Sequence, residues 1–264
     1  MAAPLPRRLL AECLGTTLLV AAVAGSGMAA TRLSPYDMGL QLLENSTATV
    51  FALAVLIVIL GPLSGAHFNP VVTVAAWWLG RRDGAGLPGR DATGYVVAQT
   101  LGAICGAVLA NAMFGVAQGL SATVRTGPRL WLGETVATAG LLLLVFALVR
   151  TGRTALAAPT VAAYIGAAYW FTSSTSFANP AVTIGRAFTE SFAGIAPASV
   201  PAFVTAQLAG ALIGVALVLA LYPLAANPIE ENRDDRPDTQ RPVRVRAQRG
   251  PFPDGGRVAE TPRR

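Results

Sequence analysis

The chain carries one pattern twice, and this repeat constrains its fold more than any other feature. Three pairs of matching positions occur in the same order in the two halves: Glu12 with Glu134, Asn69-Pro70-Val71-Val72-Thr73 with Asn179-Pro180-Ala181-Val182-Thr183, and Gln99 with Gln207. A lone Asn-Pro is weak evidence, and Asn227-Pro228 occurs without any such context. Two copies of Asn-Pro-x-Val-Thr at matching places therefore indicate a duplicated structural unit.

Each half contains three apolar stretches that approach or exceed the ~20 residues a helix needs to cross a bilayer. They cover residues 8–30, 41–61, 93–116, 130–150, 155–172 and 198–223. Because three is odd, the second half must be inverted in the membrane relative to the first. Charged residues make up only 13% of the chain, against about 25% in soluble domains. The sequence thus predicts an all-α membrane protein.

Two shorter apolar segments, at 68–80 and 179–189, begin at the Asn-Pro pairs and are too short to span. Inverted repeats with Pro-interrupted segments at matching places are typical of a pathway near the membrane midplane. Pro70 and Pro180 suit the first helical position, which makes Asn69 and Asn179 N-caps. The positive ends of two half-helices then face each other, an arrangement that repels cations and accepts neutral solutes.

Ionisable side chains inside apolar stretches have a functional or a buried structural role by default. Glu12 and Glu134 suit acceptors for backbone N–H groups of the non-helical loops, and Gln99 and Gln207 could support the loops likewise. A proton relay is the alternative, but no further acids continue it. The sequence contains one His and two Cys, so we expect no metal site and no cofactor.

The distribution of Arg predicts the orientation of the spans. With a cytoplasmic N-terminus, seven Arg of the first 225 residues lie on the cytoplasmic side and four on the other. We expect a channel domain at residues 1–225, with repeats at about 8–117 and 130–223, and a disordered cytoplasmic tail at 226–264. A cleaved signal peptide at the N-terminus is the alternative, although the apolar run is long and contains Glu12. Nucleic-acid binding is not expected, because no basic patch is interleaved with aromatic residues.

At these residues the sequence resembles the aquaporin and glycerol-facilitator (major intrinsic protein) family. Ser64-Gly65-Ala66-His67-Phe68-Asn69-Pro70 is similar to the family's first pore loop, and Ala178-Asn179-Pro180-Ala181 to its second. The resemblance implies six transmembrane helices plus two re-entrant half-helices, a bilayer location and usually a homotetramer. It also implies pore-facing carbonyls at Gly65, Ala66, His67 and Phe68, and at Thr175, Ser176, Phe177 and Ala178.

The family's outer constriction has four positions, which fall by gapless counting on Thr49, Ala167, Ser176 and Val182. Family members usually have Arg where Val182 stands. The resemblance therefore implies a wide constriction without aromatic or charged side chains, and passage of bulkier neutral solutes. Arg186, one turn beyond Val182, is either a surface residue or a positive charge in the vestibule that attracts weak acids.

The pattern at Val182 and the stretch from Phe192 to Ala198 resemble a bacterial branch associated with arsenic resistance. The sequence thus favours a passive channel of a bacterial plasma (inner) membrane, with metalloid hydroxides (arsenite, methylated arsenicals) and glycerol-like solutes as permeants. A general glycerol, urea or water facilitator is the first alternative and a proton-coupled transporter the second. No catalytic set favours an enzyme. Cys13 and Cys105 are either buried small residues or a thiol site.

Overall fold

A computed structural model describes residues 3–83 and 86–223, and these residues form helices and no β-strand. The predicted tail at 226–264 lies outside the described residues. The elements in chain order are α1 (Leu5–Leu33), α2 (Met38–Ser64), α3 (Pro70–Arg82), α4 (Gly89–Phe114), α5 (Pro128–Arg150), η1 (Thr154–Leu156), α6 (Ala157–Phe171), α7 (Pro180–Gly185), η2 (Arg186–Phe188), η3 (Pro197–Ser199) and α8 (Val200–Leu221).

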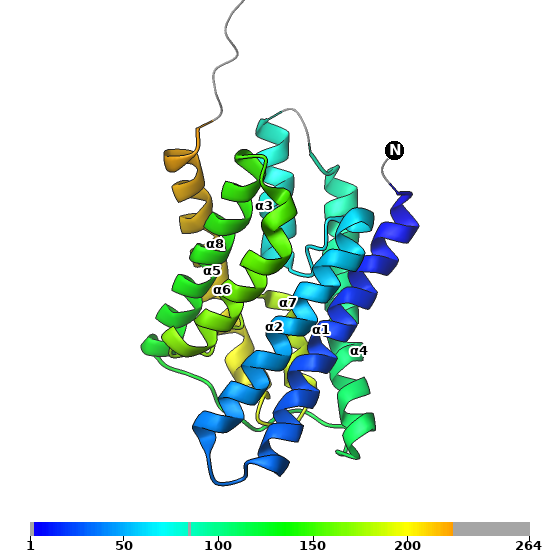
Figure 1. Ribbon diagram of the computed structural model, residues 1–264, viewed down its shortest axis with the longest axis vertical. Coiled ribbons are helices and arrows are strands. Elements are labelled where there is room, and N and C mark those ends of the chain that lie inside the picture. Colours follow the sequence, from blue (N-terminus) through cyan, green and yellow to red (C-terminus); the bar gives the residue numbers. More distant parts are fainter. Residues whose placement is uncertain (1–2, 84–85, 224–264) are drawn as a thin grey trace, which may run out of the picture. The chain divides into compact units, whose positions relative to one another are not determined.

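The long helices correspond to the six predicted spans (Figure 1). Within the described part of the chain, five are long and apolar enough to cross a membrane, namely α1, α2, α4, α5 and η3 with α8. The remaining span is α6, which has only 15 residues and is preceded directly by η1. The start of α1 and the end of α8 lie at the same end of the molecule (Figure 1), as an even number of spans requires.

The two half-helices begin where the Asn-Pro pairs predict. α3 begins at Pro70 and α7 at Pro180, and each preceding Asn accepts a backbone N–H bond as N-cap. Figure 1 shows that both begin in the middle of the molecule, and that α3 leads to the end where α1 begins. α7 leads through η2 toward the opposite end. The two halves are therefore inverted relative to each other.

Glycines bring helices close together at matching places in both halves. A Cβ at Gly102 would collide with the carbonyl oxygen of Cys13, and one at Gly210 with that of Thr135. α4 therefore lies directly against α1, and α8 lies against α5 in the same way. Small residues at such crossings are typical of helix packing in membranes, where van der Waals contact replaces the hydrophobic effect.

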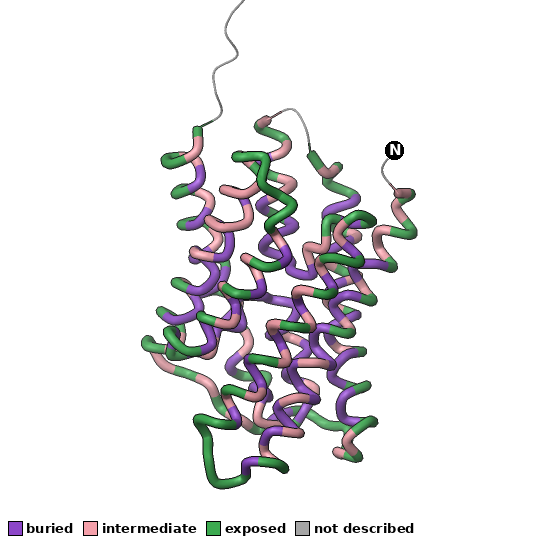
Figure 2. Tube along the Cα trace, in the orientation of Figure 1, coloured by how far each residue is buried: buried purple, intermediate pink, exposed green. Residues whose placement is uncertain are grey.

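The polarity of the fold is reversed relative to a soluble protein. Buried residues follow the inner sides of the helices and exposed residues the outer sides (Figure 2). Large apolar side chains such as Phe51, Leu132 and Leu212 are exposed, at 67%, 64% and 75%, whereas Glu12 and Glu134 are fully buried. So extensive an exposed apolar surface requires a covering, which a lipid bilayer supplies.

Candidate functional site: a channel between the half-helices

The loops that precede the half-helices have an unusual backbone. All non-glycine residues with positive φ in the described part of the chain lie in them: Ala66, Phe68, Thr175, Ser176 and Ala178. Each such residue costs about 1–3 kcal/mol and persists only where its surroundings fix it. The strain is concentrated in the two loops that the sequence predicts to line a pore.

The Glu12 carboxylate fixes the first loop. Its Oε1 accepts from the backbone N–H of His67 at 3.0 Å and from the Ser64 hydroxyl at 2.6 Å. Its Oε2 accepts from the backbone N–H of Phe68 at 2.7 Å and from Gln99 Nε2 at 2.7 Å. Charge-assisted bonds of this kind are about twice as strong as neutral ones, so one buried carboxylate offsets much of the strain in this loop.

Glu134 has the same arrangement with the second loop. Its two oxygens accept from the backbone N–H groups of Phe177 and Ala178 at 2.8 and 2.9 Å. Gln207 Nε2 donates to Glu134 at 2.6 Å and to the Thr183 hydroxyl at 2.8 Å. Gln99 bonds Thr73 of the first half-helix in the same way, at 2.9 Å. The four residues expected to support the loops thus contact the loops directly or through Glu12 and Glu134.

Asn69 and Asn179 meet across the centre of the molecule. The Asn69 oxygen accepts from the backbone N–H of Val71, and the Asn179 oxygen accepts from those of Ala181 and Val182. Each side-chain amide then donates to a carbonyl of the other loop. Every Asn therefore caps its own half-helix and binds the opposite repeat.

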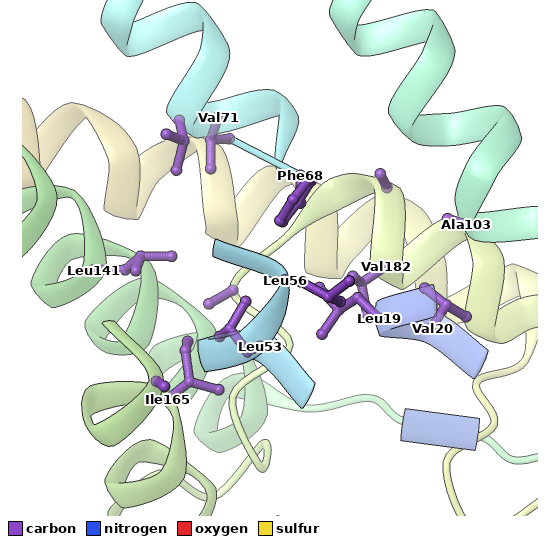
Figure 3. Close-up of a cluster of buried hydrophobic side chains, with 14 of the residues drawn as sticks. Leu19, Val20, Leu53, Leu56, Phe68, Val71, Ala103, Leu141, Ile165 and Val182 are labelled. Atoms are coloured by element: carbon purple, nitrogen blue, oxygen red, sulfur yellow. The ribbon is translucent and has the colours of Figure 1, made fainter. Parts of the chain in front are cut away.

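A cavity of about 900 Å³ runs past both asparagines. At one end, here called the Arg8 end, it is lined by Arg8, Asp83 and Arg150; at the other, the Tyr169 end, by Thr49, Tyr169, Ser176, Val182 and Arg186. Figure 3 shows apolar side chains of the surrounding cluster, with Leu53 and Leu56 from α2, Ile165 from α6 and Val182 from α7. Of the eight residues expected to present carbonyls, all but Thr175 line this cavity.

Three of the four predicted constriction residues lie together at the Tyr169 end, but Ala167 does not. Ala167 is exposed on the outer side of α6 and is not among the lining residues. The cavity side of this helix is formed by Ile165 and Tyr169, one turn apart, and the Tyr169 hydroxyl bonds that of Thr49 at 3.2 Å. Because two residues along a helix rotate a side chain by about 200°, the gapless count places Ala167 on the wrong face.

The expectation of an end without aromatic or charged side chains is also wrong. Tyr169 supplies an aromatic ring, and Arg186 lines the cavity with only 3% of its surface exposed. A surface location for Arg186 is therefore excluded. Its spacing from Val182 on one helix face was the only sequence signal for this position.

The Arg8 end contains ion pairs that sequence reasoning missed. Arg8 bonds Asp91 at 2.6 Å, and Arg150 bonds Asp83 at 3.3 Å. Arg150 also donates to the carbonyl of Tyr222 at 2.6 Å. These partners lie far apart in sequence, so no local spacing could have indicated them.

The two cysteines form no disulfide. Cys13 is half-buried on α1, and Cys105 is exposed on α4. In residues 3–83 and 86–223, no group of three or more His, Cys, Asp or Glu side chains is placed to hold a metal ion.

Comparison with known proteins agrees with this geometry. A profile of the family described as Major intrinsic protein matches residues 2–177. The chain is 51% identical over 215 residues to aquaglyceroporin AqpS of Rhizobium meliloti (strain 1021), a match that covers 81% of this chain and 89% of that protein. It is 35% identical over 121 residues to aquaporin AqpM of Methanothermobacter marburgensis, covering 40% of this chain and 46% of that one.

The X-ray structure of the aquaglyceroporin from Plasmodium falciparum has the same fold. It superposes with a TM-score of 0.55 at 20% identity, covering 83% of this chain and 96% of that chain. The predicted fold class, six spans and two re-entrant half-helices, is confirmed. The chain belongs to the major intrinsic protein family and is therefore a multi-pass membrane channel for small solutes, not an enzyme.

Proposed function

We propose that this channel passes small uncharged solutes of the size of glycerol, including metalloid hydroxides such as arsenite and methylated arsenicals of similar bulk. The observation that carries the proposal is the composition of the Tyr169 end. Three of its side chains, Thr49, Ser176 and Val182, are small, and Val182 stands where a long cationic side chain is usual in relatives. The opening is therefore wider at this level than one closed by Arg.

The lining also separates polar from apolar groups. The hydroxyls of Thr49 and Tyr169, which bond each other, give the Tyr169 end a polar surface. The aliphatic side chains of Leu19, Val23 and Leu53 give the cavity an apolar surface as well. A solute with hydroxyls and a compact apolar body satisfies both kinds of surface, because a buried polar group is costly unless it is bonded. Glycerol and trihydroxy-arsenic both have this character.

The structure gives a proton relay no support. Each of Glu12 and Glu134 accepts bonds from two backbone N–H groups and one Gln. Both oxygens of each carboxylate are therefore engaged in holding a pore loop, which supports a structural role for the two residues in a passive channel.

The remaining parts of the proposal concern the whole protein. We assign the channel domain to residues 1–225, the plasma membrane of a bacterium as its location, and the cytoplasm to both termini. The exposed apolar outer sides of the helices fit lipid and neighbouring subunits of a homotetramer. In this orientation the Arg8 end opens to the cytoplasm and the Tyr169 end to the outside.

Proteoliposomes test the proposal. Vesicles with the protein should swell back after an osmotic shock with glycerol or urea faster than empty vesicles, and should take up arsenite faster. The rates should not change when a proton gradient is dissipated. Equal rates with and without protein at matched density would contradict an open channel, and loss of uptake with the gradient would favour the proton-coupled alternative.

A further inference from the structure

Arg186 occupies a special place in the channel. It follows Val182 by four residues, one helical turn, which moves it about 6 Å further toward the Tyr169 end on the same side. It lines the cavity although only 3% of its surface is exposed. Burying a guanidinium is costly unless its donors are used, so its bonding partners indicate its role.

Two contacts fix the orientation of this guanidinium. Its Nε donates to the carbonyl of Ala193, and its central carbon lies 3.4 Å from the centroid of the Phe177 ring. Phe177 in turn packs edge-on against Phe203, with ring centroids 5.1 Å apart. A planar cation stacked on a packed aromatic ring is held rigidly.

The two terminal amino groups of Arg186 have no acceptor among residues 3–83 and 86–223. They are also absent from the atoms that are completely buried without a partner, which leaves them accessible from the cavity that Arg186 lines. The N–H groups of these two nitrogens have fixed directions and no protein acceptor, so they match the oxygens of a carboxylate or a related oxo group.

A second, half-buried cation, Arg125, strengthens the positive field. The guanidinium carbon of Arg125 lies 5.3 Å from the centroid of Phe177, and its donors bond the carbonyls of Gly194 and Phe192 at 2.7 and 3.0 Å. Neither Arg125 nor Arg186 forms an ion pair within the described residues. Burial lowers the pKa of Arg125, so nearby carboxylates do not outweigh its loss of water. A permeant that enters at the Tyr169 end therefore meets a positive electrostatic potential first at the arginines and then at the N-termini of the two half-helices.

We propose that Arg186 is the charge-selecting residue of this channel, and that its free amino groups bind the oxo or carboxylate oxygen of a permeant at the Tyr169 end while excluding cations. The inference rests on the proposed channel function and names a solute class for it, small polyol-like oxoacids beside the neutral polyols. Relatives usually have Arg where Val182 stands, whereas here the cation lies one turn further along the chain, at Arg186. The opening therefore stays wide at Val182 while the channel still recognises charge.

Three solutes with one carbon skeleton test this directly. Glycerate is glycerol with one terminal hydroxymethyl group oxidised to carboxylate, and aminopropanediol is glycerol with one terminal hydroxyl replaced by an ammonium group. Their permeabilities are measured by stopped-flow light scattering in proteoliposomes at neutral pH. The wild type should pass glycerate about tenfold or more faster than aminopropanediol, since a full charge near an arginine is worth more than 1.4 kcal/mol in a partly desolvated site.

Arg186→Gln should reduce this ratio by about tenfold, and glycerol permeability of the same vesicles reports separately whether the channel is still open. Arg186→Lys should keep most of the charge preference but lower glycerate permeability, since the planar fork is lost. Arg129→Gln is the matched control, because Arg129 is exposed in the first turn of α5 and its loss should leave the ratio unchanged.

The outcomes separate the two proposals. No glycerol permeability in the wild type would overturn the channel proposal. Glycerol permeability with no preference for glycerate over aminopropanediol would overturn only the role of Arg186, whether or not the variants fold. A wild-type preference that survives Arg186→Gln with glycerol flux intact would also overturn it and would assign the preference to another cation.

Discussion

The side-chain amide of Asn179 donates to the backbone carbonyl of Phe68 over 2.7 Å, and thereby joins the second half-helix to the first pore loop. The mirror bond runs from Asn69 to the carbonyl of Ala178 at 2.8 Å. Both carbonyls belong to residues with positive φ, so each strained loop ends on a bond from the opposite repeat. The asparagines therefore set the distance between the half-helices as well as capping them.

Asn179→Asp should weaken cation exclusion. A carboxylate cannot donate to Phe68, and its negative charge opposes the two positive helix ends that meet at this level. We expect measurable sodium or potassium flux where the wild type has none, with glycerol flux retained, in proteoliposomes loaded with an ion-sensitive dye. Asn69→Asp should act in the same way because of the repeat. Unaltered cation exclusion in both variants would place the barrier elsewhere.

Glu134→Gln should destabilise the protein by about 2–4 kcal/mol. The amide has one acceptor oxygen where the carboxylate has two, and its NH₂ group would face a backbone N–H of Phe177 or Ala178. Thermal unfolding in detergent should show a clearly lower midpoint. Glu190→Gln is the control, since Glu190 is exposed, and its effect should stay below about 1 kcal/mol. Similar midpoints for the two variants would contradict the role of Glu134 in holding the loop.

Tyr169 and Ala167 distinguish the channel face of α6 from its outer face. Tyr169→Ala removes a ring and a hydroxyl from the cavity lining, so the permeability of solutes larger than glycerol should rise several-fold relative to that of water. Ala167→Phe adds the same bulk to an exposed position and should leave solute selectivity unchanged. Osmotic swelling with a size series of polyols measures both. A selectivity change in Ala167→Phe but not in Tyr169→Ala would show that Ala167 faces the channel, as gapless counting from the two asparagines predicts.

The sequence predicts the architecture well because the determinants are local or repeated. An Asn-Pro pair is an N-cap followed by the best residue for a first helical turn, so the starts of α3 and α7 are predicted to the residue. A buried Glu in each half needs donors, and strained loops supply them. These features depend on residue type and spacing within one half of the chain.

The lining of the Tyr169 end is less predictable because it depends on rotation between helices. A one- or two-residue difference in the turn between Phe171 and the second pore loop rotates the whole face of α6, and only the packed structure shows that Tyr169 points inward. Arg186 is similar, since its burial follows from the positions of Phe177 and the Ala193 carbonyl. The ion pairs of Arg8 and Arg150 join separate helices, so spacing along the chain could not indicate them.

Val182→Arg should narrow the Tyr169 end and reduce the permeability of the largest permeants most. The new side chain would enter the cavity one helical turn before Arg186. Two guanidinium groups at such a short separation repel each other. We therefore expect glycerol permeability to fall about tenfold or more while water permeability changes less. Combining Val182→Arg with Arg186→Gln removes the repulsion and leaves one arginine at the narrower level. This double variant should recover stability in thermal unfolding but stay slow for glycerol, because the width at residue 182 and not the number of charges limits the larger solute. Full recovery of glycerol flux in the double variant would show that repulsion alone caused the loss.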